Sequence, residues 1–322
     1  MADLTRKIAL EEHFLAPGFK DYFDTTAINI SPDLFGRAYA ALQDFGDRRL
    51  EIMDAAGIDI SVLSLAGPGV QVERDTAVAV RRARECNDFL AEKMRDQPRF
   101  GGLAHLAVQA PGAAADELER CMSDLGYQGA MINGQTNGSY LDDDRFSPFW
   151  ERAEALSAPI YIHPANPHDV PHMYHDHSEL FGPVWSWTVE TANHALRLIF
   201  GGVFDRFPKA KLILGHMGET LPYQLWRFDG RWKICNAGDR KLEQKPSEYF
   251  KRNLWITTSG VCSDAPLHCA IEALGDDRIL FSVDYPFEQT HLASDWIESA
   301  DIPEKTREKI CSQNARSLLR IQ

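Results

Sequence analysis

The sequence lacks the long apolar run that a membrane span requires. Its longest stretch of this kind, Leu196–Phe204, is interrupted by Arg197 and is far shorter than the roughly 20 residues that cross a bilayer. The residues from Met1 to His13 also lack an apolar signal core. We therefore expect no membrane span and no secretion, and we expect the protein in the cytoplasm.

Positive charge is also in short supply. The chain has 34 Lys and Arg residues against 47 Asp and Glu residues, which gives a net charge of −13. So acidic a chain is a poor match for nucleic acids or for an anionic membrane surface, and we expect neither as a partner. An anionic ligand would have to be held by local positive charge.

Cysteine is sparse, and its spacing lacks any CxxC pair. The six cysteines are scattered over 322 residues, which is typical of reduced, packed thiols and speaks against a zinc ribbon. With 44% hydrophobic residues, the chain can build a large core, and this excludes a disordered protein. No linker-like tract divides it, so we expect one domain over residues 1–322.

Short aliphatic runs alternate along the chain with segments of helical periodicity. The runs predict eight strands: Lys7–Leu10, Ile58–Leu65, Phe100–Val108, Gly129–Ile132, Pro159–Ile162, Lys211–Leu214, Leu254–Thr258 and Arg278–Val283. The periodic segments predict helices: Ala77–Arg95, Ala113–Leu125, Pro148–Leu156, Val189–Phe207, Glu219–Trp232, Ala265–Leu274 and Lys305–Leu319. This alternation indicates a parallel sheet covered by helices.

Eight such units favour an α/β fold of the (β/α)8 TIM barrel type, whose usual size is about 250 residues. The alternative is a doubly wound open sheet, but no glycine-rich phosphate loop follows the first strand. Three long βα loops account for the extra length: Ala16–Asp47, Gln135–Phe146 and Pro164–Pro183. We expect them to form the pocket at the C-terminal mouth.

Ionisable residues stand at the ends of four of these strands. Glu11 and His13 follow the first strand and share a face because strand side chains alternate. His163, His216 and Asp284 end or follow the fifth, sixth and eighth strands. Each alone has a structural explanation, such as a core histidine or an N-cap aspartate, but together they lie on one rim of the expected barrel.

Glutamate, aspartate and two histidines make a mixed nitrogen and oxygen set that suits a divalent first-row ion. We predict Glu11, His13, His163 and Asp284 as the metal ligands. The fourth strand is followed by Asn133-Gly134 and offers no lysine to bridge a second ion. We therefore expect one ion, Mn²⁺ or Zn²⁺, with Mg²⁺ as a further candidate.

These strand-end motifs resemble those of the amidohydrolase superfamily over essentially the whole chain. They are Leu10-Glu11-Glu12-His13-Phe14, Tyr161-Ile162-His163-Pro164, Gly215-His216-Met217-Gly218-Glu219 and Val283-Asp284-Tyr285-Pro286-Phe287-Glu288. Hydrolases of that superfamily carry His-x-His where this chain has Glu11-x-His13. In this respect the chain is similar to the nonoxidative decarboxylases of ortho-hydroxybenzoates, which act on γ-resorcylate, 2,3-dihydroxybenzoate, salicylate or 5-carboxyvanillate.

The resemblance implies a metal-dependent carboxy-lyase that acts on a small aromatic acid without an organic cofactor, as a homodimer or homotetramer. It implies that the four residues named above bind the metal and that His216 and Glu219 form a dyad beside it. We expect Asp284 to be the neutral acid that protonates the ring before CO2 leaves, with a pKa raised by nearby carboxylates and the anionic substrate. We expect His216, oriented by Glu219, to contact the substrate's carboxylate or phenolic oxygen.

Two other functions stay open at this point. One is a metal-dependent hydrolase or hydratase that cleaves a lactone of aromatic catabolism on the same scaffold. The other is a barrel that binds a phenolic acid without turnover.

The substrate's carboxylate needs a further cation, because two carboxylate ligands already neutralise a divalent ion. Arg227 is the first candidate, since it shares a face with Glu219 on the expected helix Glu219–Trp232. It lies about 12 Å along that helix, so it would act through its long side chain or serve a neighbouring subunit; a surface ion pair is the alternative. Arg49 is the second candidate.

Phe23 and Phe287 are candidates for an aromatic wall of the pocket, with core packing as the alternative. The histidine-rich loop His168–His177 suits a solvated or interface loop better than a second metal site. His105 and His194 are expected to be packed in the interior.

Overall fold

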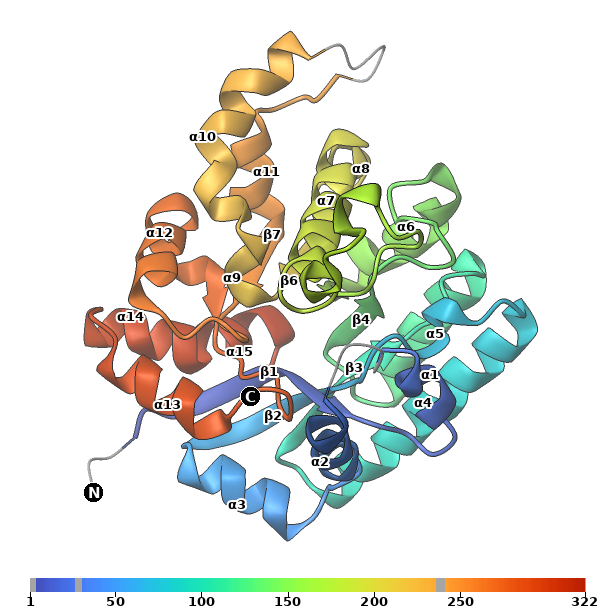
Figure 1. Cartoon of the computed structure of the whole chain (residues 1–322), viewed down its shortest axis with the longest axis vertical. Coiled ribbons are helices and arrows are strands. Elements are labelled where there is room, and N and C mark those ends of the chain that lie inside the picture. The colour runs from blue at the N-terminus through green and yellow to red at the C-terminus, as the bar shows by residue number, and fades with distance from the viewer. Residues whose placement is uncertain (1–3, 27–30, 236–240, 322) are drawn as a thin grey trace.

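A closed barrel of eight parallel strands forms the centre of the protein (Figure 1). The structure is a computed structural model that describes residues 4–26, 31–235 and 241–321. The strands follow one another around a single sheet in the order β1 to β8. A parallel bridge between Leu10 and Ser282 closes the sheet, supported by a 2.7 Å hydrogen bond from the His13 amide to the Tyr285 carbonyl. The expected (β/α)8 barrel is confirmed.

The eight strands are β1 (Lys7–Phe14), β2 (Ile58–Leu65), β3 (Phe100–His105), β4 (Gly129–Asn133), β5 (Pro159–His163), β6 (Lys211–Leu214), β7 (Leu254–Thr257) and β8 (Ile279–Leu280). The α-helices are α1 (Lys20–Asp24), α2 (Pro32–Leu42), α3 (Asp47–Ala55), α4 (Thr76–Asp96), α5 (Pro111–Asp124), α6 (Ser147–Leu156), α7 (Ser186–Phe200), α8 (Val203–Arg206), α9 (His216–Glu219), α10 (Leu221–Arg231), α11 (Pro246–Asn253), α12 (Asp264–Leu274), α13 (Thr290–Ser299), α14 (Glu304–Glu308) and α15 (Asn314–Leu319). Short 3-10 turns include η6 (Trp232–Ile234).

Several strand ends differ from the sequence prediction. β1 extends four residues beyond Leu10, and β3 ends at His105 rather than Val108. β8 ends at Leu280, where its backbone pairing with β7 stops. Beyond this point the Thr258 hydroxyl accepts a hydrogen bond from the Ser282 amide and donates one to the Ser282 carbonyl, both at 3.0 Å. An apolar run therefore continues past the point where backbone pairing stops.

Three expected helices are interrupted. The segment Val189–Phe207 divides into α7 and α8 at Gly202, whose φ of 73° is left-handed. The segment Glu219–Trp232 is broken at Thr220, whose φ of 65° separates the end of the irregular turn α9 from α10, which begins at Leu221. The segment Lys305–Leu319 contains a π-helical turn, Lys309–Gln313, between α14 and α15.

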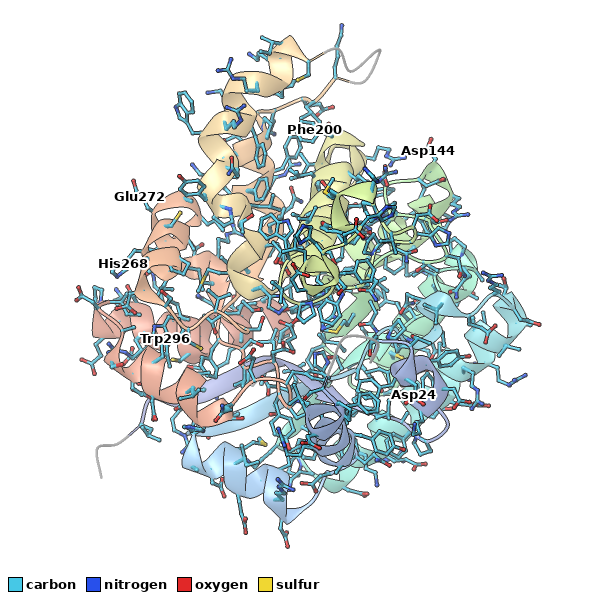
Figure 2. The ribbon with its side chains drawn as sticks, viewed as in Figure 1. Asp24, Asp144, Phe200, His268, Glu272 and Trp296 are labelled. Atoms are coloured by element: carbon cyan, nitrogen blue, oxygen red, sulfur yellow. The ribbon has the colours of Figure 1, made fainter. Side chains whose placement is uncertain are left out.

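Two apolar clusters hold the barrel together. The larger one lies between the strands and the surrounding helices. The smaller one fills the barrel interior with residues such as Ile8, Leu10 and Met131, and Leu318 of α15 packs into it. Among the described helices, none is both long and apolar enough to cross a membrane. Figure 2 shows side chains crowding the centre, whereas the labelled Asp144 and His268 lie at the periphery.

Candidate metal centre and active site

A bulge near the end of β1 turns the site residues into the barrel. Leu10 belongs to the interior cluster, so strict alternation would send Glu12 inward after it. Instead, Glu11 has a φ of 58°, and the register with β2 shifts just before Glu12. This bulge directs Glu11 and His13 together into the mouth, while Glu12 accepts a 2.9 Å hydrogen bond from the Val283 amide.

The four expected metal ligands converge at the mouth of the barrel. Glu11, His13, His163 and Asp284 each offer one ligand atom, and these atoms lie within 4.8 Å of one another. His13 Nε2 is 3.1 Å from Asp284 Oδ1, and His163 Nε2 is 3.6 Å from Glu11 Oε1. Among the described residues, no other group of three or more His, Cys, Asp or Glu side chains is placed to hold an ion.

The hydrogen bonds of the Glu11 carboxylate indicate whether the four side chains fit a metal ion. Its Oε2 accepts from the hydroxyl of Tyr161 and, at 3.4 Å, from that of Thr257. Its Oε1 is buried and has no hydrogen-bond partner among the described residues. A buried oxygen left in this way is costly unless a donor or cation meets it. The donor set and this unpaired oxygen therefore fit a divalent cation.

Both histidines of this group are oriented by a contact of their second ring nitrogen. His163 Nδ1 lies 2.8 Å from the carbonyl of Pro164, which can only accept, so Nδ1 carries the proton and Nε2 offers its lone pair. His13 Nδ1 lies 3.1 Å from the hydroxyl of Ser64. Burial lowers the pKa of His163 to about 3, and a neutral imidazole is the form that binds metals.

His216 and Glu219 form the expected pair next to the ligands. His216 Nδ1 is 2.8 Å from Glu219 Oε1, and its Nε2 is 3.6 Å from Asp284 Oδ2 and 3.9 Å from Glu11 Oε1. Burial disfavours a charged imidazole, but the carboxylates of Glu219 and Glu11 outweigh it and raise the pKa of His216 well above its usual value. The neighbouring carboxylates therefore favour the charged form of this imidazole, whose Nε2 faces Glu11 and Asp284.

The carboxyl group of Asp284 faces the imidazoles of His13 and His216. Burial alone would raise the pKa of its carboxyl group, but contacts with His13 and His216 outweigh burial and hold that pKa below its usual range. The sequence expectation of a raised pKa invoked the neighbouring carboxylates and a bound anionic substrate, and the two imidazoles act in the opposite direction. The carboxyl group is consequently ionised between them.

Left-handed backbone gathers around the site. Ten non-glycine residues among those described have positive φ, and six of them are site residues or flank one. They are Glu11, His216, Met217, Glu219, Thr220 and Asp284. Such conformations cost about 1–3 kcal/mol each and persist where surrounding contacts hold them, most often at functional sites.

Gly215 keeps the space beside Glu11 open, and we predict that Gly215→Ala weakens metal binding about 10- to 100-fold. A Cβ at this position would lie 2.9 Å from Glu11 Oε2 and 3.0 Å from the Tyr161 hydroxyl, so the carboxylate would have to move. Titration of the metal-depleted protein with Mn²⁺ measures the effect. Gly230→Ala in α10 is the matched control, because a Cβ there meets nothing within 4 Å. Equal affinities in the two variants would contradict the prediction.

Arg49 lies in the outer layer of the fold. It is 2% exposed, and its Nη2 donates to the carbonyl oxygens of His13 at 2.8 Å and Ala41 at 3.1 Å. Its guanidinium carbon lies 4.6 Å from the centre of the Tyr285 ring. The structure thus places this candidate substrate contact against the backbone of His13, and its contact with a substrate stays a prediction.

We predict that Arg49→Met destabilises the fold by about 2 kcal/mol, because it leaves two carbonyl oxygens without their donor. The free energy of unfolding in urea measures this. Arg48→Met changes the exposed neighbouring residue and should stay within about 0.5 kcal/mol of the unsubstituted protein. If both variants have the same free energy of unfolding, the buried contacts of Arg49 do not stabilise the end of β1.

Arg227 is exposed on α10, and no ion pair involving it occurs among the described residues. The prediction that it shares a helix face with Glu219 is wrong. Glu219 has a φ of 52° and ends the irregular turn α9, whereas Arg227 belongs to α10, which begins at Leu221.

The aromatic candidates form a row that starts at a metal ligand. The ring centre of Phe287 lies 5.8 Å from that of His13, and Phe23 lies 6.3 Å from Phe287. Phe35 of α2 stacks on Phe23 at 5.0 Å. The residues are thus brought together near the site, while their contact with a substrate stays a prediction.

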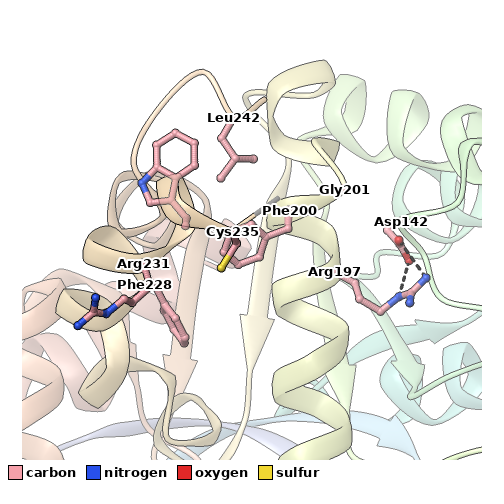
Figure 3. Close-up of a pocket in the computed structure, with 9 residues that line it drawn as sticks. Asp142, Arg197, Phe200, Gly201, Phe228, Arg231, Cys235 and Leu242 are labelled. Carbon is pink, nitrogen blue, oxygen red and sulfur yellow. Dashed lines mark hydrogen bonds and ion pairs between the residues drawn. The ribbon is translucent and has the colours of Figure 1, made fainter. Parts of the chain in front are cut away.

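Two other features lie apart from this site. A cavity of about 560 Å³ opens between the end of α7 and α10, where Phe200, Phe228 and Trp232 line it, and none of the four ligands borders it (Figure 3).

In the histidine-rich loop, His172 Nδ1 and His175 Nδ1 lie 3.2 Å apart without a third ligand among the described residues. His105 and His194 are buried, as expected.

Comparisons with known proteins agree with this geometry. A model of the amidohydrolase family matches residues 13–321. A γ-resorcylate decarboxylase from Polaromonas sp. strain JS666 is 44% identical over 98% of both chains, and one from Rhizobium sp. strain MTP-10005 is 42% identical over 98% of both. The crystal structure of a Polaromonas sp. JS666 dihydroxybenzoic acid decarboxylase with manganese and the inhibitor 2-nitroresorcinol has a TM-score of 0.92 at 43% identity, covering 98% of this chain and 97% of that one.

Another similar solved structure is that of a 2,6-dihydroxybenzoate decarboxylase in complex with 2,6-dihydroxybenzoate. Its structure has a TM-score of 0.92 at 42% identity and covers 99% of this chain and 100% of that one. This chain belongs to the amidohydrolase family of metal-dependent barrels. Within that family it groups with the nonoxidative hydroxybenzoate decarboxylases, as its strand-end motifs predict.

Proposed function

We propose that this protein is a metal-dependent decarboxylase of an ortho-hydroxybenzoate of the dihydroxybenzoate or salicylate class. The observation that carries the proposal is the convergence of Glu11, His13, His163 and Asp284, with His216 Nε2 3.6 Å from Asp284 Oδ2. The likeness to γ-resorcylate decarboxylases over nearly the whole chain supports it. We propose Mn²⁺ as the ion, with Zn²⁺ as the alternative, because manganese occupies a similar enzyme.

A divalent ion held by these four residues would supply positive charge that binds phenolate and carboxylate oxygens and withdraws electron density from the ring. The residues of the chain do the rest. His216, charged and held by Glu219, faces the region where an anionic substrate enters. The row of Phe287 and Phe23 offers a flat apolar wall for the ring. Arg49, through the His13 carbonyl, acts as a positioning residue.

Each turnover takes up one proton, because the ring gains a hydrogen at the carbon that loses CO2. We propose that Asp284 delivers this proton. The bond between the ring and the carboxylate then breaks, and its electron pair restores aromaticity. His216 Nε2 lies 3.6 Å from Asp284 Oδ2, so His216 is the group from which Asp284 takes up this proton. No oxidant takes part in this sequence.

The test is a substrate panel of salicylate, 2,3- and 2,6-dihydroxybenzoate and 5-carboxyvanillate, given to metal-loaded protein and followed by mass spectrometry. We expect loss of CO2 from at least one acid. The hydrolase alternative predicts that ¹⁸O from labelled water enters a lactone product, whereas decarboxylation places no water oxygen on the ring. No CO2 from any acid, with metal confirmed in the protein, would refute the proposal.

We also propose that the protein is a homodimer or homotetramer that works in the cytoplasm. On α10, Tyr223 is 78% exposed and Trp226 is 83% exposed, which is typical of a surface that another subunit covers. Arg227 lies on the same exposed helix and is the proposed cation for a substrate carboxylate, in its own subunit or a neighbouring one. The cysteines are all free, which supports a reducing compartment. Sedimentation of the native protein and of Trp226→Ala tests the assembly.

A further inference from the structure

Three buried hydroxyl groups lie in a row next to the Glu11 carboxylate. They belong to Tyr161 of β5, to Thr257 at the end of β7 and to Ser259 two residues further along, and all three residues are fully buried. Thr257 Oγ1 lies 2.9 Å from the Tyr161 hydroxyl and 2.9 Å from Ser259 Oγ. The Tyr161 hydroxyl bonds to Glu11 Oε2, and Ser259 Oγ lies 3.1 Å from the backbone amide of His216. The row thus joins a proposed metal ligand to the turn that carries His216.

The direction of every hydrogen bond in this row can be assigned. A carboxylate oxygen can only accept, so Tyr161 donates its proton to Glu11 Oε2. With that proton used, the Tyr161 oxygen accepts from Thr257. The proton of Thr257 is then also used, so its oxygen accepts from Ser259, whose oxygen in turn accepts from the His216 amide. All the donors therefore point toward Glu11, and hydrogen bonds in such a chain polarise and strengthen one another.

Two glycines allow the close approach that this row needs. β6 lies between β5 and β7 in the sheet, so Tyr161 and Thr257 are not on neighbouring strands. Gly215, directly after β6, leaves room between them, because a Cβ there would lie 3.0 Å from the Tyr161 hydroxyl. At the other end, a Cβ on Gly260 would lie 3.0 Å from His216 Cδ2. The loop after Ser259 therefore packs directly against the imidazole.

We infer that Tyr161, Thr257 and Ser259 are positioning residues, whose hydroxyl groups form a one-way hydrogen-bond chain that fixes the Glu11 carboxylate for metal binding and ties it to the turn of His216. The inference rests on the metal centre of the proposed function. Burying a carboxylate is costly unless donors meet it, and groups that orient a ligand strengthen metal binding. The chain holds Oε2 of Glu11 and leaves the unpaired Oε1 to the ion.

Tyr161→Phe removes the donor to Glu11 and is expected to weaken Mn²⁺ binding about 10- to 100-fold. Calorimetric titration of the metal-depleted protein with Mn²⁺ measures the affinity, and the free energy of unfolding of the same preparation reports any damage to the fold. Tyr249→Phe is the matched control. Tyr249 is also fully buried and donates to a carboxylate, that of Asp205, but it lies on α11, which carries none of the four proposed ligands.

The control should keep the affinity for Mn²⁺ within about twofold, because it lies outside the site. Equal affinities in the two tyrosine variants would overturn the inference.

Substitutions of Thr257 and Ser259 test whether the hydroxyl groups act as a chain. Thr257→Val should weaken Mn²⁺ binding about tenfold, whereas Thr257→Ser keeps the hydroxyl and should stay within about twofold of the unsubstituted protein. Ser259→Ala should weaken binding about threefold. This loss should be smaller in the Thr257→Val background, because the Ser259 hydroxyl donates to Thr257. Equal losses in both backgrounds would show that the hydroxyl groups act separately, which overturns the chain.

Electron paramagnetic resonance of bound Mn²⁺ supplies a readout that does not depend on affinity. The line shape reports the geometry of the ligands around the ion. At saturating Mn²⁺ it should change in Tyr161→Phe and Thr257→Val and stay unchanged in Thr257→Ser and Tyr249→Phe. An unchanged line shape in Tyr161→Phe would overturn the positioning role.

These measurements need no substrate, so they separate the inference from the proposed function. If an acid of the panel releases CO2 and Tyr161→Phe binds Mn²⁺ as tightly as the unsubstituted protein, the chain is wrong and the decarboxylase stands. If Tyr161→Phe loses affinity for Mn²⁺ and no acid releases CO2, the chain stands and the decarboxylase fails.

Discussion

Asp284→Asn is expected to lower kcat for decarboxylation by about 10²- to 10⁴-fold, the usual contribution of a positioned acid. The amide keeps the size of the side chain and one oxygen toward the metal, but it cannot carry the proton to the ring. The measurement is the rate of CO2 release at saturating metal and substrate, with the metal content of the variant determined on the same sample. Metal saturation is needed because Asp284 is also one of the four grouped ligands.

Asp295→Asn provides the control for this experiment. It makes the same chemical change at an exposed position on α13, and kcat should not change. Full activity of Asp284→Asn with the ion bound would show that another group protonates the ring. Loss of activity together with loss of the ion would assign Asp284 to metal binding, and a kcat restored by excess Mn²⁺ would then contradict its role as the acid.

Removal of the metal ion is expected to abolish decarboxylation, and addition of Mn²⁺ or Zn²⁺ to the depleted protein should restore it. The reason is that Glu11 Oε1, buried and unpaired, and the charge of an aromatic carboxylate both need a cation at the same place. Activity before and after chelation, and after titration with each ion, measures this and identifies the preferred ion. Turnover by protein that elemental analysis shows to be metal-free would contradict it.

Substitution of two adjacent glutamates also tests the metal site. Glu11→Gln should weaken metal binding about 100-fold or more, since it removes a charged ligand. Glu12→Gln should have little effect, because burial raises the pKa of Glu12 to about 8, so a neutral side chain already stands there at pH 7. Equal metal affinity in the two variants would mean that Glu11 is not a ligand.

The barrel and the convergence of the four expected ligands could be predicted because both follow from strand periodicity. Each ligand comes at the carboxyl end of an apolar run, and in a (β/α)8 barrel all such ends meet at one mouth. Residues that support the ligands gave a weaker signal. Tyr161, which donates to Glu11, precedes His163 by two positions and so shares its inward face, but an aromatic residue in a strand has many other uses.

Charge states and helix starts could not be predicted in the same way. Glu219 falls at helical spacing from Arg227, yet left-handed residues separate it from α10, and no local pattern announces them. The charge of Asp284 depends on His13 and His216, which approach it from other strands. The burial of Arg49 against Ala41 and Tyr285 likewise depends on tertiary packing.

The bulge at Glu11 has a consequence for anyone who would move this chemistry to another scaffold. Leu10, the residue before Glu11, points into the barrel. On a regular strand with that alternation, the side chains at positions 11 and 13 would both point outward, toward the surrounding helices. The information that brings the pair inward resides in one left-handed backbone residue and not in the identity of the side chains. A graft of the two residues alone should yield a protein that folds and fails to bind metal, whereas a graft that includes the extra strand residue should bind it.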